Sequence, residues 1–251
     1  MRSELILSTA KRAADQYCGE PLDLMWTDPP FGTGKKQSGK EGSYFDHSDT
    51  DSVRSDIVAW LPHMAENSTV VICCDYRLAP KICVSMMDSD WEYRGEVIWS
   101  FGLGRPRTSW WPVRHNNIMT FTQGSARFDS NAIPVEERKA AKPGYGPTKP
   151  AGSVWDRTMS NTDPERVGYP NQKPLSIIKP FILAHTMQND LVLDPFMGSG
   201  STGKAALDLG RRFYGVDSNP QSLQVATKQL GNYLTKCDAL YGPLPSDDDN
   251  S

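Results

Sequence analysis

The sequence predicts one α/β domain built on a doubly wound, mostly parallel sheet. Apolar runs bounded by glycine, proline and aspartate alternate with segments of helical periodicity, a pattern typical of strands covered by helices on both faces. With 251 residues and 38% hydrophobic content, the chain is long enough to bury one substantial core. We expect a single domain over residues 1–240 and a disordered acidic tail over residues 241–251.

The order of the expected elements follows from these runs. Strands are predicted at residues 22–27, 68–74, 95–101, 116–122, 190–194 and 211–217. Helices are predicted at residues 8–17, 52–64, 79–88, 174–186, 201–209 and 220–230. The third and fourth strands break the alternation, because the linker between them is too polar for a helix. We expect these two strands to form an antiparallel pair at an edge of the sheet.

The segment between residues 125 and 163 has no periodicity and is rich in Gly, Pro, Lys and Arg, which predicts a loop-rich insertion rather than a second core. The whole chain has a formal charge of −3, yet residues 94–157 hold ten Lys and Arg against five Asp and Glu. Such a local basic surface can attract phosphates. On charge alone, an ordinary solvated surface is an equally good interpretation.

Cysteines and apolar segments limit the class of protein. The five cysteines contain no C-x-x-C pair, and Cys73 and Cys74 lie in the apolar run TVVICC, so we expect reduced thiols rather than disulfides. The four histidines have no metal-ligand spacing, so no metal is expected. No apolar stretch approaches membrane-spanning length, and the first residues lack a signal-peptide pattern. The expectation is a cytoplasmic protein without a membrane partner.

A glycine-rich turn follows the fifth predicted strand. The stretch GSGSTG at residues 198–203 precedes a helix, and Asp217 ends the next strand, which matches the G-x-G-x-x-G dinucleotide pattern. The match is weakly specific, and a dinucleotide-dependent oxidoreductase would explain it. However, Asp194 ends the strand where the turn begins, and a carboxylate there repels a pyrophosphate and attracts an ammonium or sulfonium centre. The pattern therefore favours a cationic nucleoside such as S-adenosylmethionine.

A second glycine-rich stretch, residues 34–40, has the spacing of a phosphate-binding P-loop. Glu41 stands where magnesium needs a Ser or Thr hydroxyl, so the match fails. We expect a mobile polar loop beside the site, either a lid over the substrate or a plain solvated loop.

The first predicted strand ends in Asp28-Pro29-Pro30-Phe31. Both prolines fix φ and lack an N–H, so this segment is rigid and its carbonyls are free of helical hydrogen bonds. The Asp28 carboxylate and the Pro29 carbonyl are spaced to accept both hydrogens of one exocyclic amino group, and Phe31 can stack on the ring. A base inside a duplex has to be flipped out to reach them. A strand-ending turn with a buried Phe is the alternative.

These two motifs together carry a resemblance. DPPF and DPFMGSGST resemble the amino-methyltransferases that modify adenine N6 or cytosine N4 in DNA. The order of catalytic motif, basic insertion and cofactor motif is similar to the permuted β group, and YPNQKPLSIIKPFILA and RRFYGVDSNP extend the similarity. The resemblance implies a class I, Rossmann-like fold and transfer of a methyl group from S-adenosylmethionine, with the acid before the prolines favouring adenine N6.

The resemblance also implies roles for single residues. The target amine would be held by Asp28, Pro29, Pro30 and Phe31. The cofactor would be bound by Lys173, Asp194, Phe196, Gly198, Gly200, Ser201, Thr202, Asp217 and Asn219. Within this set, Asp217 would accept from the ribose hydroxyls and Lys173 would approach the methionine carboxylate. The chain departs from the family at Ser8, where the family usually has an acid that contacts the cofactor adenine.

The resemblance places target recognition between the motifs, in Arg105, Arg107, Arg114 and residues 125–163. Arginine reads guanine bidentately or holds phosphate, and phosphate contact is the commoner role. DNA is therefore the expected partner, with single or double strands and a monomer or homodimer left open. The alternatives are an N4-cytosine DNA methyltransferase, an RNA N6-adenine methyltransferase and, more remotely, an oxidoreductase or a non-catalytic DNA-binding relative.

Overall fold

The computed structural model describes residues 3–46, 49–101, 111–138, 147–160, 162–233 and 239–240. A sheet in the order β10-β6-β7-β5-β2-β11-β12-β1-β13 forms its centre. The mutually parallel strands are β5 (Met64–Cys74), β2 (Leu22–Thr27), β11 (Leu191–Asp194), β12 (Arg212–Asp217), β1 (Glu4–Leu7) and β13 (Ala239–Leu240). The predicted mostly parallel sheet is confirmed.

The predicted antiparallel pair is present, but it does not form the edge. β7 (His115–Thr122) runs antiparallel to both β5 and β6 (Glu92–Ser100). β6 is then covered by the parallel strand β10 (Val154–Asp156), which comes from the insertion. The expected edge position is therefore wrong, because a strand of three residues is too short to produce a periodic pattern in the sequence.

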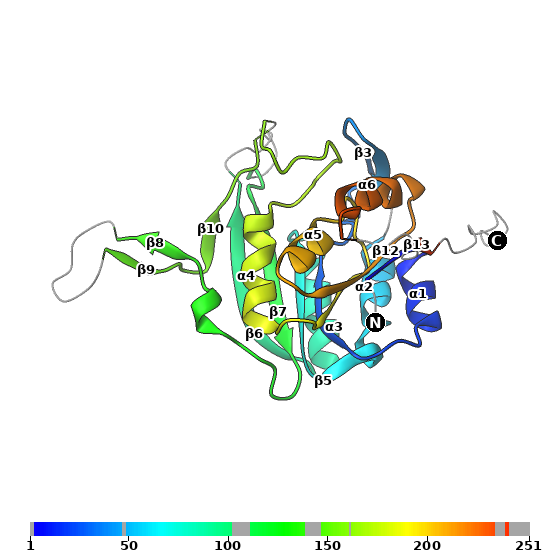
Figure 1. Cartoon of the computed structure of the whole chain (residues 1–251). Coiled ribbons are helices and arrows are strands. Elements are labelled where there is room, and N and C mark those ends of the chain that lie inside the picture. Colours follow the sequence, from blue (N-terminus) through cyan, green and yellow to red (C-terminus); the bar gives the residue numbers. More distant parts are fainter. Residues whose placement is uncertain are drawn as a thin grey trace.

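Helices cover both faces of the sheet, as the doubly wound prediction requires. One core cluster includes side chains from α1 (Ala10–Gln16), α2 (Thr50–Val58) and α3 (Ala79–Asp88). The other includes side chains from α4 (Leu175–His185), α5 (Ser201–Asp208) and α6 (Pro220–Leu230). Figure 1 shows α4 and α5 in front of the sheet. Side chains of β2 enter both clusters, since successive residues of a strand point to opposite faces.

Capping residues set the helix boundaries more tightly than the apolar pattern does. The side chain of Thr9 accepts from the N–H of Arg12, so α1 begins after Thr9 and not at residue 8. The carboxylate of Asp49 caps α2. The expected helix to residue 64 instead ends at Val58, where the 3₁₀ turn η1 (Leu61–His63) leads into β5. Both differences are at element ends: a side-chain cap decides the first, whereas at the end of α2 the backbone N–H of Ala59 donates to Ser55 and Ile57.

The expected mobile loop after the DPPF motif is a β-hairpin. β3 (Lys35–Ser38) pairs antiparallel with β4 (Ser43–Asp46), with Lys35 opposite Asp46 and Ser38 opposite Ser43. The prediction of a loop is wrong because each strand has only four residues: β3 is polar throughout, and the two aromatic residues of β4 are too few to show alternation.

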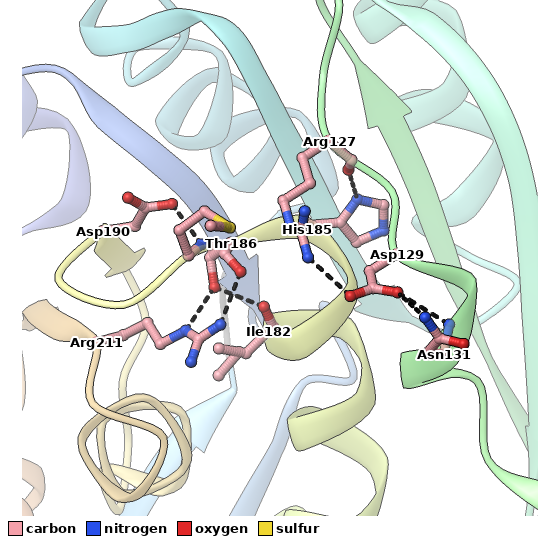
Figure 2. A network of polar contacts seen from close by, with 9 residues as sticks. Arg127, Asp129, Asn131, Ile182, His185, Thr186, Asp190 and Arg211 are labelled. Carbon is pink, nitrogen blue, oxygen red and sulfur yellow. Dashed lines mark hydrogen bonds and ion pairs between the residues drawn. The ribbon is translucent and has the colours of Figure 1, made fainter.

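The insertion contains η2 (Ser130–Ala132) and a second hairpin of β8 (Val135–Glu137) and β9 (Thr148–Pro150), which projects from the body beside β10 in Figure 1. Its base is fastened to the end of α4. Nδ1 of His185 lies 2.9 Å from the carbonyl oxygen of Arg127, and the N–H of Asp129 donates to the carbonyl of Ala184 at 2.8 Å. Figure 2 shows the contact of His185 with Arg127 and the neighbouring contact of Arg211 with Thr186.

No helix in the described part of the chain is long and apolar enough to cross a membrane.

Candidate active site

One cavity of about 310 Å³ lies at the carboxyl edge of the sheet and is lined by residues of both predicted motifs. β2 and β11 are parallel neighbours, with Leu24 opposite Val192, so the segments after these strands leave the sheet at the same edge. Asp28 and Asp194 therefore line one cavity although they are far apart in the sequence. The fold brings the expected amine site and the expected cofactor turn together.

Asp28 has one carboxylate oxygen in an ion pair and one oxygen free. Oδ2 accepts from the ammonium of Lys173, and the two side chains are only 21% and 9% exposed respectively. Oδ1 is buried and accepts no conventional hydrogen bond from the described residues, while the buried thiol of Cys73, a weak donor, also acts on this carboxylate. Burial raises the pKa of Asp28, and the charge of Lys173 opposes this rise. An unpaired buried acceptor of this kind can take a hydrogen bond from a substrate donor.

Lys173 is held in place by groups other than Asp28 as well. Its Nζ donates to the carbonyl of Asn171 at 3.1 Å. The same atom lies 5.8 Å from the ring centroid of Phe31 and 5.9 Å from that of Trp99, within cation–π range. The anionic partner raises the pKa of Lys173 in spite of its burial. In this structure Lys173 therefore contacts the DPPF motif, and its approach to a cofactor carboxylate stays a prediction.

Asp46, which the sequence analysis missed, fixes the loop that follows the DPPF motif. This buried carboxylate accepts from the N–H of Gly32 at 2.9 Å, and from the N–H and hydroxyl of Thr33 at 3.1 and 2.7 Å. The N–H of Gly34 donates to the Asp46 carbonyl at 2.7 Å. The rigid tetrapeptide is thus followed by a loop that is itself anchored. A single aspartate in a polar stretch has no pattern that would reveal this role.

The β3–β4 hairpin also bridges two other parts of the site. The carbonyl of Ser43 accepts from Nδ2 of Asn219 at 2.9 Å, and the N–H of Ser43 donates to Oε1 of Gln221 at 3.1 Å. On the other side, Nδ2 of Asn171 donates to the hydroxyl of Tyr44 at 2.9 Å. The hairpin thereby links the start of α6 with the segment before α4.

Asp194 is the centre of the turn after β11. Its Oδ1 accepts from the hydroxyl of Thr27 at 2.8 Å and from the N–H of Phe196 at 3.1 Å, and its Oδ2 accepts from the hydroxyl of Thr202 at 2.6 Å. Burial raises the pKa of Asp194 to about 7, against the lowering by these hydrogen bonds. Asp194 lines the cavity as predicted, and it also ties β2, the glycine turn and α5 together.

Glycines and a second acid complete the turn. Gly198 has φ +50° and Gly200 has φ +86°, a region that side chains rarely adopt. The N–H of Gly198 donates to Oδ2 of Asp217 at 2.9 Å, and the N–H of Asn219 donates to Oδ1 at 2.8 Å. Burial raises the pKa of Asp217. A carboxylate has about four acceptor positions, so Asp217 can still accept from hydroxyls in the cavity.

Most of the predicted site residues line the cavity. These are Asp28, Pro30, Lys173, Asp194, Phe196, Gly198, Ser201, Thr202, Asp217 and Asn219. Of the others, Phe31 is half-buried against the core. Gly200, which caps the start of α5, packs close to Ala226 of α6. Pro29 is not among the lining residues. The lining residues that the sequence analysis did not single out include Thr9, Ala10, Trp26, Tyr44, Asp56 and Tyr169.

Of the three arginines predicted to contact DNA, Arg105 and Arg107 lie outside the described residues. Arg114 is exposed just before β7, and its carbonyl accepts from the N–H of Phe101 at 2.9 Å.

The chemistry of the cavity fits S-adenosylmethionine. This cofactor carries an ammonium, a sulfonium and ribose hydroxyls, all of which favour carboxylate neighbours. Asp194 and Asp217 line the cavity beside the glycine turn. Because Gly198 has no side chain, a ligand can approach the backbone there. A pyrophosphate would meet the same carboxylates and be repelled, so the donor set argues against a dinucleotide.

Comparisons with known proteins agree with this chemistry. The Type II methyltransferase M.HpaI of Haemophilus parainfluenzae is 24% identical over 96% of this chain and 78% of its own length. The DNA adenine methyltransferase YhdJ of Escherichia coli is 26% identical over 84% of this chain and 76% of its own length. The solved structure of the M1.HpyAVI complex with S-adenosylmethionine superimposes with a TM-score of 0.65, at 23% identity, over 90% of this chain and 98% of that one.

The family model of the N6 and N4 methyltransferases, described as DNA methylase, matches residues 22–228, a range that holds the DPPF motif, the insertion and the glycine turn. The match covers most of the chain, and the chain therefore belongs to this family of S-adenosylmethionine-dependent DNA methyltransferases.

Proposed function

We propose that this protein transfers a methyl group from S-adenosylmethionine to the N6 amino group of adenine in DNA. The observation that carries the proposal is the free, buried Oδ1 of Asp28 in the cavity that also contains the glycine turn. Leaving a buried acceptor unpaired costs about 1–3 kcal/mol, which a donor from the substrate would recover. An exocyclic amino group is such a donor.

The residues of the DPPF motif prepare this amine for attack. The charge of Lys173 favours the ionised form of Asp28 against the effect of burial, and an ionised carboxylate is a strong hydrogen-bond acceptor. The carbonyl of Pro29 is the proposed second acceptor. Taking both hydrogens turns the nitrogen lone pair away from the ring, and the nearby carboxylate stabilises the positive charge that develops on nitrogen. When bound, S-adenosylmethionine supplies the methyl group.

Adenine is preferred over cytosine for two reasons. The motif has an aspartate before its prolines, which is the family tendency for adenine enzymes. YhdJ, similar over most of this chain, is a DNA adenine methyltransferase. N4 of cytosine has the same donor geometry and remains the alternative that the product analysis below separates.

For DNA binding we propose phosphate contacts from Arg105, Arg107 and Arg114, together with the insertion. Phosphate contacts hold the duplex in register and are sequence-independent, so they alone cannot define a recognition sequence.

The cytoplasm is the proposed location. The four described cysteines form no disulfide, which agrees with a reducing compartment; they are Cys18, Cys73, Cys74 and Cys83.

The test is a product analysis. The protein is incubated with methyl-labelled S-adenosylmethionine and with double-stranded DNA, single-stranded DNA or RNA, and the digested nucleosides are identified by mass. We expect labelled N6-methyladenine from DNA. Labelled N4-methylcytosine would contradict the choice of base, and label in RNA alone would contradict the choice of nucleic acid.

Asp28→Asn is the matched control for this test, because it keeps the shape of the side chain and removes its charge. We expect the variant to bind S-adenosylhomocysteine with an affinity close to that of the wild type and to lose most of the transfer. Full transfer by Asp28→Asn would contradict the role of the carboxylate.

A further inference from the structure

The order of the strands in the sheet determines which part of the cavity lies beside which strand. Along the carboxyl edge, the strands follow one another as β2, β11, β12 and β1. Residues at or just after the carboxyl end of each strand line the cavity, namely Asp28, Asp194, Asp217 and Thr9. Three strand spacings separate β2 from β1, roughly 14 Å. If the amine site is at β2 and the ribose acceptor at β12, the cofactor adenine lies toward β1.

The acid expected at that end is missing. Ser8 follows β1, and it is not among the residues that line the cavity, whereas its neighbours Thr9 and Ala10 are. The N–H of Ser8 donates to the carbonyl of Asp217 at 3.0 Å, which ties this residue to β12. The end of β1 therefore offers no carboxylate to the cavity.

A carboxylate reaches the cavity from a different element. Asp56 is on α2, which packs against α1 and the core through Val53 and Ile57, and its side chain lines the cavity together with Thr9 and Ala10. Asp56 is half-buried and forms no ion pair with any described cation, since the neighbouring Lys11 pairs with Asp15. Burial raises the pKa of Asp56 to about 6, with Lys11 opposing the rise.

We infer that Asp56 binds the 6-amino group of the cofactor adenine, in place of the acid that is absent after β1. This inference rests on the proposed function. A carboxylate without a cation partner, at the adenine end of a cavity, is a strong acceptor for an amino group, because hydrogen bonds to charged groups are stronger than neutral ones. It also makes the cofactor site selective for a 6-amino purine over purines that lack this donor.

The plainer explanation is that Asp56 only stabilises the first turn of α1, where the N–H of Lys11 lowers its pKa. The two explanations differ in what they predict for ligand binding. A purely structural Asp56 changes stability and is indifferent to the group at position 6 of the purine. A residue that binds the amino group discriminates between ligands that differ only there.

The experiment measures dissociation constants by isothermal titration calorimetry. The probes are S-adenosylhomocysteine and its analogue with unsubstituted purine in place of adenine. We expect the wild type to bind S-adenosylhomocysteine about 10- to 100-fold more tightly than the analogue. Asp56→Ala is expected to bring this ratio close to one, and Asp56→Asn, which keeps a neutral acceptor, to give an intermediate ratio.

Asp51→Asn is the matched control, since Asp51 is on the same helix, carries the same charge and is 65% exposed. We expect it to keep the wild-type ratio. Thermal unfolding checks that each variant is folded. The comparison of the two probes on the wild type does not depend on any variant folding. Equal wild-type affinities for the two probes, or an unchanged ratio in folded Asp56→Ala, would overturn the inference and leave the methylation of adenine in DNA standing. A wild type that binds neither probe and transfers no methyl group would refute the proposed function and this inference with it.

Discussion

Replacing Lys173 with methionine removes the ammonium from the buried pair with Asp28 and nearly keeps the length of the side chain. Removing one partner of a buried ion pair costs about 3–5 kcal/mol, because the other charge remains without compensation. The Asp28 side chain is 21% exposed, so we expect the lower end, about 3 kcal/mol of unfolding free energy. Urea denaturation at pH 7 measures this loss. The double variant Lys173→Met/Asp28→Asn should recover part of it, since neither charge is then left unpaired.

The same substitution changes the pH dependence of methyl transfer. In Lys173→Met, burial raises the pKa of Asp28 without the opposing charge of Lys173, so the carboxylate ionises only at higher pH. Because the folded state then holds a proton that the unfolded state releases, the stability of the variant falls as the pH rises above the ordinary pKa of aspartate.

This shift is tested by single-turnover rates measured from about pH 5 to about pH 9. We expect the rising limb of the variant's rate to lie at higher pH than that of the wild type. Equal unfolding free energies and superimposable pH–rate profiles would refute the idea that Lys173 sets the charge of Asp28.

Three further substitutions test the supports of the site. Asp46→Ala removes three hydrogen bonds from the loop after the DPPF motif and should slow transfer at least about tenfold in single-turnover assays, while affinity for S-adenosylhomocysteine stays within about threefold; unchanged rates would contradict the anchoring role. Thr202→Val takes one donor from buried Asp194 and should cost about 1–3 kcal/mol in urea denaturation, a loss that Ser, which keeps the hydroxyl, should largely avoid. Gly200→Ala, at φ +86° with the new Cβ 3.0 Å from Ala226, should lower stability by about 2 kcal/mol, and an unaffected melting temperature would argue against this backbone geometry.

The predictable parts of the fold and site are those fixed by short stretches of sequence. The two prolines after Asp28 restrict the backbone, and the glycines at 198 and 200 permit the positive φ of a tight turn, so both turns could be recognised without the structure. β2, β5, β6, β7, β11 and β12 carry apolar runs between turn residues, which mark them equally clearly. The sequence analysis does not predict β1, β3, β4, β8, β9 and β10, which have three or four residues each, too few for a periodic pattern.

The contacts of single polar side chains could not be predicted. The family resemblance implies that Lys173 binds the cofactor. Its ion pair with Asp28 depends instead on how the segment before α4 lies against the end of β2. Asp46 and Asp56 are isolated acids in polar or helical segments, where most acids are solvated. Asp46 is distinguished only by its hydrogen bonds to the loop after the DPPF motif, and Asp56 only by the position of α2 beside the cavity.

The position of β11 and β12 in the sheet has a consequence for synthesis of the chain. These strands, which begin at Leu191 and Arg212, lie between β2 and β1, so a nascent chain that ends before residue 191 has a gap in the middle of its sheet. Both flanking strands then expose unpaired backbone edges, which invite misassociation. The sheet therefore closes only after the chain has been synthesised through Asp217, and chaperones that shield strand edges should bind a chain that ends before Leu191 more than one that extends beyond Asp217.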